Sequence, residues 1–226
     1  MSEQDFAGRT VVVFGAGGAL GAGVAEAFAA AGAQVTGVDR SEPAAGRRLA
    51  GVSYASADVL DDGAVGAFFG SLADAPWAVI NTIGGFAPAR PLDQLEVTEL
   101  SGQLQLNLVS AAVVTKHALG AMRPAGQGRL VHTASRAGLV SQGSGFAYSV
   151  SKLGVLHLVA MAADEVRGSG ITVNCVVPSI IDTPANRAAI PSADHARWPK
   201  VPDIARTYLY LADPGSGLVN GAAVPV

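Results

Sequence analysis

Two patterns of hydrophobic positions alternate along the chain. Short runs of β-branched and other apolar residues are separated by longer, Ala-rich stretches in which apolar residues recur every three or four positions. The short runs predict strands, and several are apolar at consecutive positions, as strands covered on both faces are. The predicted strands are 10–14, 34–38, 52–56, 77–81, 129–134, 171–177 and 222–226.

Helical periodicity fills most of the intervals between these strands, and further helices are predicted at about 97–122, 147–167 and 202–212. The interval between Asp39 and the third strand has room for only an abbreviated helix or none. Strand–helix alternation indicates right-handed crossovers, and hence an α/β, doubly wound, seven-stranded parallel sheet with helices on both faces. We expect a single domain over residues 1–226, because α/β domains of about 200–250 residues are common.

One segment does not fit this alternation. Residues 178–202 are rich in proline and show no regular periodicity. A connection of that length is uncommon within a compact domain unless it has a function of its own. We therefore expect a lid over a binding site, at about residues 184–200.

Composition excludes several classes of function. The chain has 15 basic and 18 acidic residues, a formal charge of −3, so it lacks the basic surface of a nucleic-acid-binding protein. The acidic start has none of the features of a signal peptide, and no apolar run reaches the roughly 18 residues of a membrane span. We expect a cytoplasmic protein without membrane or nucleic-acid partners. The four histidines show no metal-ligand spacing, and the single cysteine, Cys175, is expected to be buried.

A glycine-rich turn, "GAGGALGAG", follows the first strand directly. Glycine is needed where the backbone takes positive φ or lies against a phosphate, and the N-terminus of the following helix attracts an anion. The spacing is Gly15-x-x-x-Ala19-x-Gly21 rather than the general dinucleotide pattern, which would place its third glycine at Leu20. The turn is predicted to bind a dinucleotide through Gly15, Gly18, Ala19, Leu20 and Gly21.

Asp39 ends the second predicted strand, 18 residues beyond Gly21. An acid about 20 residues beyond the turn accepts hydrogen bonds from the adenosine ribose. Its charge also repels a 2′-phosphate, so NAD(H) is favoured. Arg40 is adjacent and can pair with that phosphate, which leaves NADP(H) possible.

Tyr148 and Lys152 stand four positions apart, on one face of a predicted helix. With the glycine turn and Asp39, they complete an ordered set of motifs that resembles the short-chain dehydrogenase/reductase family over nearly the whole chain. The remaining matches are "ADV" (57–59), "NTIGG" (81–85), Asn107, "TASRAGL" (133–139) with Ser135 thirteen residues before Tyr148, and "VVPSIIDTP" (176–184). The resemblance implies a Rossmann fold.

The resemblance also implies a set of site residues. The catalytic residues would be Asn107, Ser135, Tyr148 and Lys152. Besides the turn, the cofactor would be bound by Asp39, Arg40, Asp58, Val59, Asn81, Gly84, Tyr148, Lys152, Pro178, Ile181 and Thr183. The substrate pocket would be formed by Phe86, Leu139, Val140, Ser179, Ile180, Arg187 and Trp198, with Arg187 as the possible partner of an anionic group.

The implied chemistry is reasonable for these residue types. A free tyrosine has a pKa near 10, and both a lysine ammonium and an oxidised nicotinamide ring would lower it. Tyr148 would then exchange a proton with the substrate oxygen, and Ser135 would hydrogen-bond that oxygen. Lys152 would also hold the nicotinamide ribose, and Asn107 would hold a water that links Lys152 to solvent.

Three departures from the family pattern stand out. Phe14 replaces the usual threonine, so the hydrogen bond of that threonine to the motif after the fourth strand is expected to be absent. Thr82 and Ile83 alter the motif itself, and Ser179 replaces a glycine. The shortened middle and the lid also resemble dihydropteridine reductases.

The favoured function is therefore hydride transfer between NAD(P)(H) and a carbonyl or secondary alcohol of a small, moderately apolar substrate. One alternative is reduction of a quinonoid pterin or another C=N bond, and another is a non-catalytic dinucleotide sensor. The two long helices carry more apolar surface than one sheet face needs, which predicts a homo-oligomer, a tetramer or a dimer.

Overall fold

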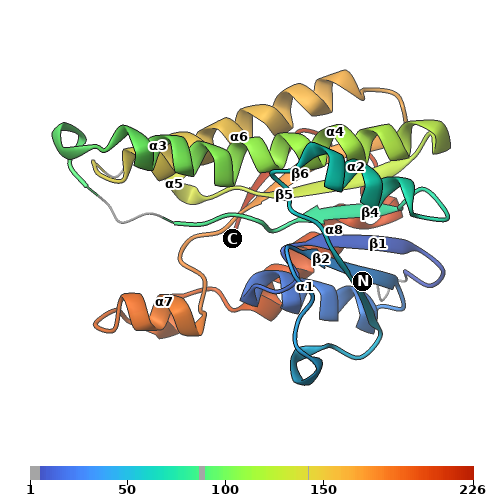
Figure 1. Cartoon of the computed structure of the whole chain (residues 1–226), viewed down its shortest axis with the longest axis horizontal. Helices are drawn as coiled ribbons and strands as arrows, with labels where there is room; N and C mark the ends of the chain where they lie inside the picture. Colours follow the sequence, from blue (N-terminus) through green and yellow to red (C-terminus); the bar gives the residue numbers. More distant parts are fainter. Residues whose placement is uncertain (1–5, 87–89, 142) are drawn as a thin grey trace.

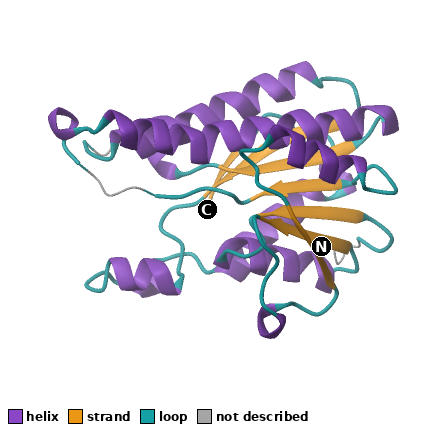
Figure 2. Cartoon of the chain, viewed as in Figure 1, coloured by secondary structure: helices purple, strands orange, loops and turns teal. Residues whose placement is uncertain are grey.

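The computed structural model describes residues 6–86, 90–141 and 143–226. Within these residues seven parallel strands form one sheet, in the order β3-β2-β1-β4-β5-β6-β7 (Figures 1 and 2). The strands are β1 Thr10–Phe14, β2 Gln34–Asp39, β3 Val52–Ser56, β4 Ala78–Asn81, β5 Gly128–Thr133, β6 Ile171–Val177 and β7 Ala223–Pro225. All seven predicted strands are confirmed, and the strand order reverses between β1 and β4, where ligands bind in sheets of this kind.

Helices cover both faces of the sheet (Figure 1). One face carries α1 Ala19–Ala30 and α8 Val201–Ala212, and the other carries α2 Asp62–Gly70, α4 Ser110–Met122 and α6 Phe146–Glu165. Three shorter helices, α3 Val97–Gln103, α5 Arg136–Leu139 and α7 Pro184–Ala189, lie near the carboxyl ends of the strands. Alternate residues of a strand point to opposite faces, so β1 contributes Val11 and Val13 to one core, and Val12 and Phe14 to the other.

The predicted helix over 97–122 is not a uniform α-helix. A π-helical turn, Leu104–Val109, joins α3 to α4, and Asn107 lies within it. π-Helical turns are rare and frequent at functional sites. The short interval after β2 holds only a single 3₁₀ turn, Ala45–Arg47, as expected.

Helix α6 has the length and the apolar composition of a membrane span, although its sequence includes Lys152 and ends with two acidic residues. In the fold it packs against β6 and the π-helical turn, and it buries Ser151 and Lys152 with several small apolar residues. The apolar character of α6 therefore serves the core of the domain.

Candidate active site

The glycine turn joins the end of β1 to the start of α1. Gly15 has φ +83°, a left-handed conformation that favours glycine. A Cβ on Gly21 would lie 2.1 Å from the carbonyl oxygen of Gly15, so only glycine fits there. Gly18 precedes the helix without a side-chain cap, which leaves the first N–H groups of α1 for a ligand. This local geometry fits a pyrophosphate at the helix N-terminus.

Asp39, at the end of β2, lies directly against this turn. Its Oδ2 accepts a hydrogen bond from the Gly17 N–H at 3.1 Å, and its Oδ1 accepts one from the Arg40 N–H at 2.8 Å. A Cβ on Gly17 would lie 2.9 Å from Oδ2. The carboxylate and the turn are therefore one unit, while the Arg40 side chain is exposed.

Asp58 and Val59 follow shortly after the end of β3. Asp58 is exposed and accepts a hydrogen bond from the Leu60 N–H at 3.0 Å, whereas Val59 is buried. Both follow the edge strand β3, which pairs with β2 and its terminal Asp39.

Thr82 links the loop after β4 to the end of β1. Its hydroxyl donates to the carbonyl oxygen of Phe14 at 2.8 Å, and its N–H donates to the same oxygen at 3.0 Å. A Cβ on either Gly15 or Gly21 would lie 2.6 Å from the Thr82 hydroxyl. Phe14 has no side-chain hydroxyl, so the hydrogen bond of the family's threonine at this position is absent, as expected. Thr82 provides a hydroxyl bond between the same two segments from the other side, and this hydroxyl packs against both glycines.

The four residues expected to be catalytic, here called the tetrad, come from three elements and converge at the ends of β4 and β5. Tyr148 and Lys152 lie on α6, and Ser135 is the N-cap of α5. The Lys152 side chain is buried, and its Nζ donates to the carbonyl oxygen of Thr133 at 3.0 Å. Ser135 accepts a hydrogen bond from the Ala137 N–H at 3.2 Å and makes another with the Tyr148 phenol.

Asn107 completes the tetrad from the π-helical turn. Its Oδ1 accepts from the Gly85 N–H at 3.0 Å, and its Nδ2 donates to the Gly85 carbonyl at 3.0 Å. A Cβ on Gly84 would lie 2.7 Å from both Asn107 Oδ1 and Lys152 Nζ, so the backbone passes between these two side chains only because residue 84 is glycine. The Nδ2 also lies 3.0 Å from Gln103 Oε1 and 3.1 Å from Ser151 Oγ.

The residues expected to contact substrate lie in several places near the carboxyl ends of the strands. Phe86 is 70% exposed, and its ring meets the Tyr148 ring edge-on, with 5.1 Å between centroids. Leu139 and Val140 line a separate hollow of about 320 Å³ beside α6, together with Leu92, Phe146 and Leu153. Ser179 and Ile180 are exposed beyond the end of β6.

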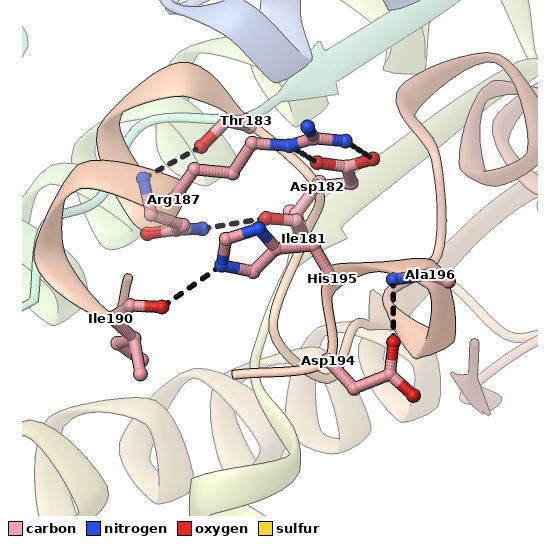
Figure 3. A network of polar contacts seen from close by, with 9 residues as sticks. Ile181, Asp182, Thr183, Arg187, Ile190, Asp194, His195 and Ala196 are labelled. Atoms are coloured by element: carbon pink, nitrogen blue, oxygen red, sulfur yellow. Dashed lines mark hydrogen bonds and ion pairs between the residues drawn. The ribbon is translucent and has the colours of Figure 1, made fainter. Parts of the chain in front are cut away.

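The segment 184–200 has an internal structure of its own (Figure 3). The Asp182 carboxylate receives the Arg187 guanidinium in a two-pronged ion pair, with Nε–Oδ1 at 2.5 Å and Nη2–Oδ2 at 2.8 Å. The Asp182 N–H donates to the Pro199 carbonyl at 2.9 Å, which closes the base of the loop. The Arg187 charge is therefore already neutralised by Asp182, and the expected anion partner has no free charge in this structure.

Other lid residues are held in the same way. Thr183 caps α7 by accepting a hydrogen bond from the Asn186 N–H at 3.2 Å. Trp198 is half-buried, and its ring packs on His195 with 4.5 Å between centroids. Ile181 accepts a hydrogen bond from Asn186 through its carbonyl, and the buried Pro178 accepts one from the Arg136 N–H.

Comparison with known proteins agrees with this geometry. The sequence profile of the family described as short chain dehydrogenase matches residues 9–193. This chain belongs to the short chain dehydrogenase family. It is 32% identical to cis-4-hydroxycyclohexanecarboxylate dehydrogenase of Sinomonas cyclohexanicum, over 99% of this chain and 96% of that protein. The structure of a short-chain type dehydrogenase/reductase from Mycobacterium ulcerans superposes with a TM-score of 0.90 at 26% identity, covering 98% of this chain and 89% of that one. The structure of levodione reductase gives a TM-score of 0.88 at 26% identity over 98% and 96%.

This dehydrogenase is accordingly an oxidoreductase that acts on an alcohol/carbonyl pair with NAD(P). Its own residues fit the cofactor, because Gly15, Gly17 and Gly21 pack too closely against the protein to carry side chains, which sets the course of the turn. The N-terminus of α1 has no side-chain cap, so its N–H groups are left for a phosphate. Among the described residues, no group of three or more His, Cys, Asp or Glu side chains is placed to hold a metal ion.

Burial dominates the electrostatics of the dehydrogenase's site. It lowers the pKa of Lys152 to about 8, because the ammonium has lost its water shell. Burial also raises the pKa of Tyr148, and the hydrogen bond with Ser135 opposes that rise. We had expected the charge of Lys152 to lower the pKa of Tyr148. In the structure desolvation of the phenol outweighs it, so an oxidised nicotinamide ring is the remaining positive charge that would act in the expected direction.

Asn81, which is expected to bind the cofactor, is buried. Its side chain contacts His132 Nδ1 at 3.2 Å and accepts from the Ile83 N–H at 3.1 Å, so it holds the loop after β4 in place. Two other polar residues of the site were not found from the sequence. Gln103 and Ser151 hold Asn107. The available signals were weak: Gln103 precedes Asn107 by four positions, and Ser151 lies between Tyr148 and Lys152.

Proposed function

We propose that this dehydrogenase uses NAD(H) to interconvert a secondary alcohol and a ketone on a small, mostly apolar ring, with Tyr148 as the acid–base group. The convergence of Ser135, Tyr148 and Lys152 with Asn107 around Gly84 is the observation that supports it. A dinucleotide-sensing protein would need the glycine turn and Asp39 but not this convergence.

When bound, the reduced cofactor supplies the hydride that the substrate carbon receives. The Tyr148 phenol donates a proton to the carbonyl oxygen in reduction, and it takes that proton back in oxidation. One lone pair of the Ser135 oxygen accepts from the Ala137 N–H, which orients the hydroxyl, and its proton can be donated to the substrate oxygen as charge develops. Lys152 gives one of its three N–H groups to Thr133, which leaves two for the ribose and for Tyr148.

The preference for NAD(H) rests on Asp39. Its carboxylate is held over the turn by two backbone N–H groups, and a 2′-phosphate on the adenosine ribose would bring negative charge beside it. The exposed Arg40 is the one neighbouring group that would favour the phosphate instead.

The substrate class rests on the side chains around the tetrad. Phe86 packs on Tyr148, and the exposed Leu139, Val140 and Ile180 belong to the same group of expected pocket residues. Arg187 is paired with Asp182, which favours a neutral ring over a carboxylate. The relative of Sinomonas cyclohexanicum is named for a hydroxylated cyclohexane that carries a carboxylate, which supports a ring alcohol of that size but not its neutrality.

A panel of cyclohexanols, cyclohexanones, their 4-carboxylates and quinonoid pterins, read by cofactor absorbance, tests this proposal. We expect turnover of the neutral ring ketones and alcohols, and a Kd for NADH at least about tenfold below that for NADPH, because of the charge of Asp39. The Asp39→Ala variant should lose that discrimination, while Asp74→Ala, at an exposed acid outside the expected cofactor site, serves as a matched control. Equal or tighter binding of NADPH, or turnover of pterins alone, would contradict the proposal.

We further propose a homo-oligomer, with a tetramer favoured over a dimer. Leu106 and Val109, near the start of α4, are exposed, and so are Leu153 and Met161 on α6. Exposed apolar side chains on neighbouring helices are a common feature of subunit interfaces. Light scattering at micromolar concentration should give two or four times the mass of 22.7 kDa, and a monomer would contradict this part.

A further inference from the structure

Tyr208 brings a buried hydroxyl to the active site from the opposite face of the sheet. It lies on α8, is fully buried, and its OH is 2.6 Å from the Thr133 hydroxyl. The Thr133 hydroxyl also lies 2.8 Å from the main-chain oxygen of Asn81. Helix α8 packs on the face with α1, whereas the tetrad helix α6 packs on the other (Figure 1).

The direction of these hydrogen bonds follows from their partners. The Asn81 carbonyl oxygen carries no proton, so the Thr133 hydroxyl must donate to it. A hydroxyl has only one proton, so in the second bond the Thr133 oxygen accepts and Tyr208 donates. Burial raises the pKa of Tyr208 far above its ordinary value, so this proton stays in place throughout the working range.

The residue held in this way is the one that binds Lys152. The main-chain oxygen of Thr133 accepts the hydrogen bond from Lys152 Nζ at 3.0 Å, and Ser135 follows two residues after Thr133, which ends β5. The side chain of Thr133 is therefore anchored to α8 and β4, while its carbonyl is presented to α6. We propose that Tyr208 is a positioning residue for the active site, which acts through Thr133 to hold the carbonyl that binds the Lys152 ammonium.

This effect is measurable because Lys152 titrates separately from the titratable groups around it. The titratable groups that face it are Tyr148 on its own helix, His132 on β5 and Cys175 on β6. The pKa of His132 is lowered to about 3 and that of Cys175 is raised to about 12, so neither titrates together with Lys152. A change in the Lys152 pKa then reports on its hydrogen bond to Thr133.

The Tyr208→Phe variant deletes the donor and keeps the ring in the core. A poorly held carbonyl binds the ammonium less well, so the Lys152 pKa should fall by roughly 0.5–1 unit. The chain has only three lysines, Lys116, Lys152 and Lys200, so an NMR titration of ¹³C-labelled lysine resolves each one without any cofactor or substrate. The Lys152→Met variant identifies the Lys152 signal in the spectrum. In the pH profile of kcat/KM, the limb that reports the ionisation of Lys152 should shift by the same amount as the pKa.

Tyr210→Phe is the matched control, because Tyr210 is on the same helix and 50% exposed. It should leave the Lys152 titration unchanged. Thr133→Val is the second variant, since it keeps the carbonyl and removes both hydroxyl bonds, and it should shift the pKa in the same direction. A folded Tyr208→Phe protein with an unchanged Lys152 titration would overturn the proposal. If that variant does not fold, an unchanged titration in Thr133→Val would overturn it as well.

Discussion

Replacing Tyr148 with phenylalanine is expected to lower kcat by about 10²–10⁴-fold, or roughly 3–5 kcal/mol of barrier. The substitution removes one hydroxyl and leaves the ring packed against Phe86, 5.1 Å away between centroids. Without that hydroxyl the substrate oxygen has no acid–base partner, and Ser135 alone provides a hydrogen bond without an exchangeable proton of suitable acidity. Stopped-flow or steady-state measurement of turnover checks this.

NADH affinity should change little in the same variant, because Lys152, Asp39 and the glycine turn are intact. Tyr54→Phe is a suitable control, since the Tyr54 hydroxyl accepts a hydrogen bond from the Leu49 N–H at 3.1 Å, in the segment before β3 and outside the tetrad. Undiminished turnover in Tyr148→Phe would reject Tyr148 as the acid–base group. A large loss of NADH binding would show that the phenol contacts the cofactor more than the substrate.

Acid is expected to destabilise the protein through His132, on the order of 5 kcal/mol by pH 3. The ring is fully buried, and burial together with the charge of Lys152 lowers its pKa to about 3. Both ring nitrogens are committed: the Asn81 amide nitrogen contacts Nδ1 at 3.2 Å, and the Thr115 hydroxyl lies 2.9 Å from Nε2. Because the Thr115 hydroxyl donates to the Ala111 carbonyl, Nε2 carries the proton and Nδ1 accepts. A second proton would place a donor against the Asn81 donor.

The sign of the effect follows from the two pKa values. In the unfolded chain His132 is protonated below about pH 6.5, whereas in the folded chain it is protonated only below about pH 3. Between these values the unfolded state holds more protons, so the free energy of unfolding falls as pH falls. Above pH 7 the residue contributes no pH dependence.

Denaturant unfolding of the wild type and of His132→Gln at pH 7, 5 and 4 isolates the contribution of His132 to the pH dependence of stability. The amide of glutamine is neutral at every pH used, so the variant should lose less stability on acidification than the wild type, even if it is less stable at pH 7. The comparison of slopes cancels the acid response of the carboxylates that both proteins share. Parallel stability curves would rule out His132 as the source.

The amino-acid sequence by itself determined the architecture and the identity of the tetrad. β-Branched runs and three-to-four-residue periodicity report burial within one element, so all seven strands were predicted within about two residues. The tetrad was predicted from the resemblance to the family, whose motifs place Tyr148 and Lys152 four positions apart on one face of a helix and Ser135 thirteen residues before Tyr148. The short connection after β2 was equally visible, since the twelve residues between Asp39 and Val52 do not hold a full crossover helix.

Only the tertiary structure decided which polar groups meet. Thr82 and Phe14 are 68 positions apart, and Tyr208 and Thr133 are 75 apart, so neither bond leaves a periodic signal in the sequence. The pairing of Arg187 with Asp182 removed the free cation that the sequence offered to a substrate. The pKa of Tyr148 is raised rather than lowered because the phenol is buried. That burial comes from the packing of α5 on α6 and of Phe86 on the Tyr148 ring, which the sequence does not show. Motif spacing specifies which groups are present, whereas desolvation and long-range hydrogen bonds specify the state in which they act.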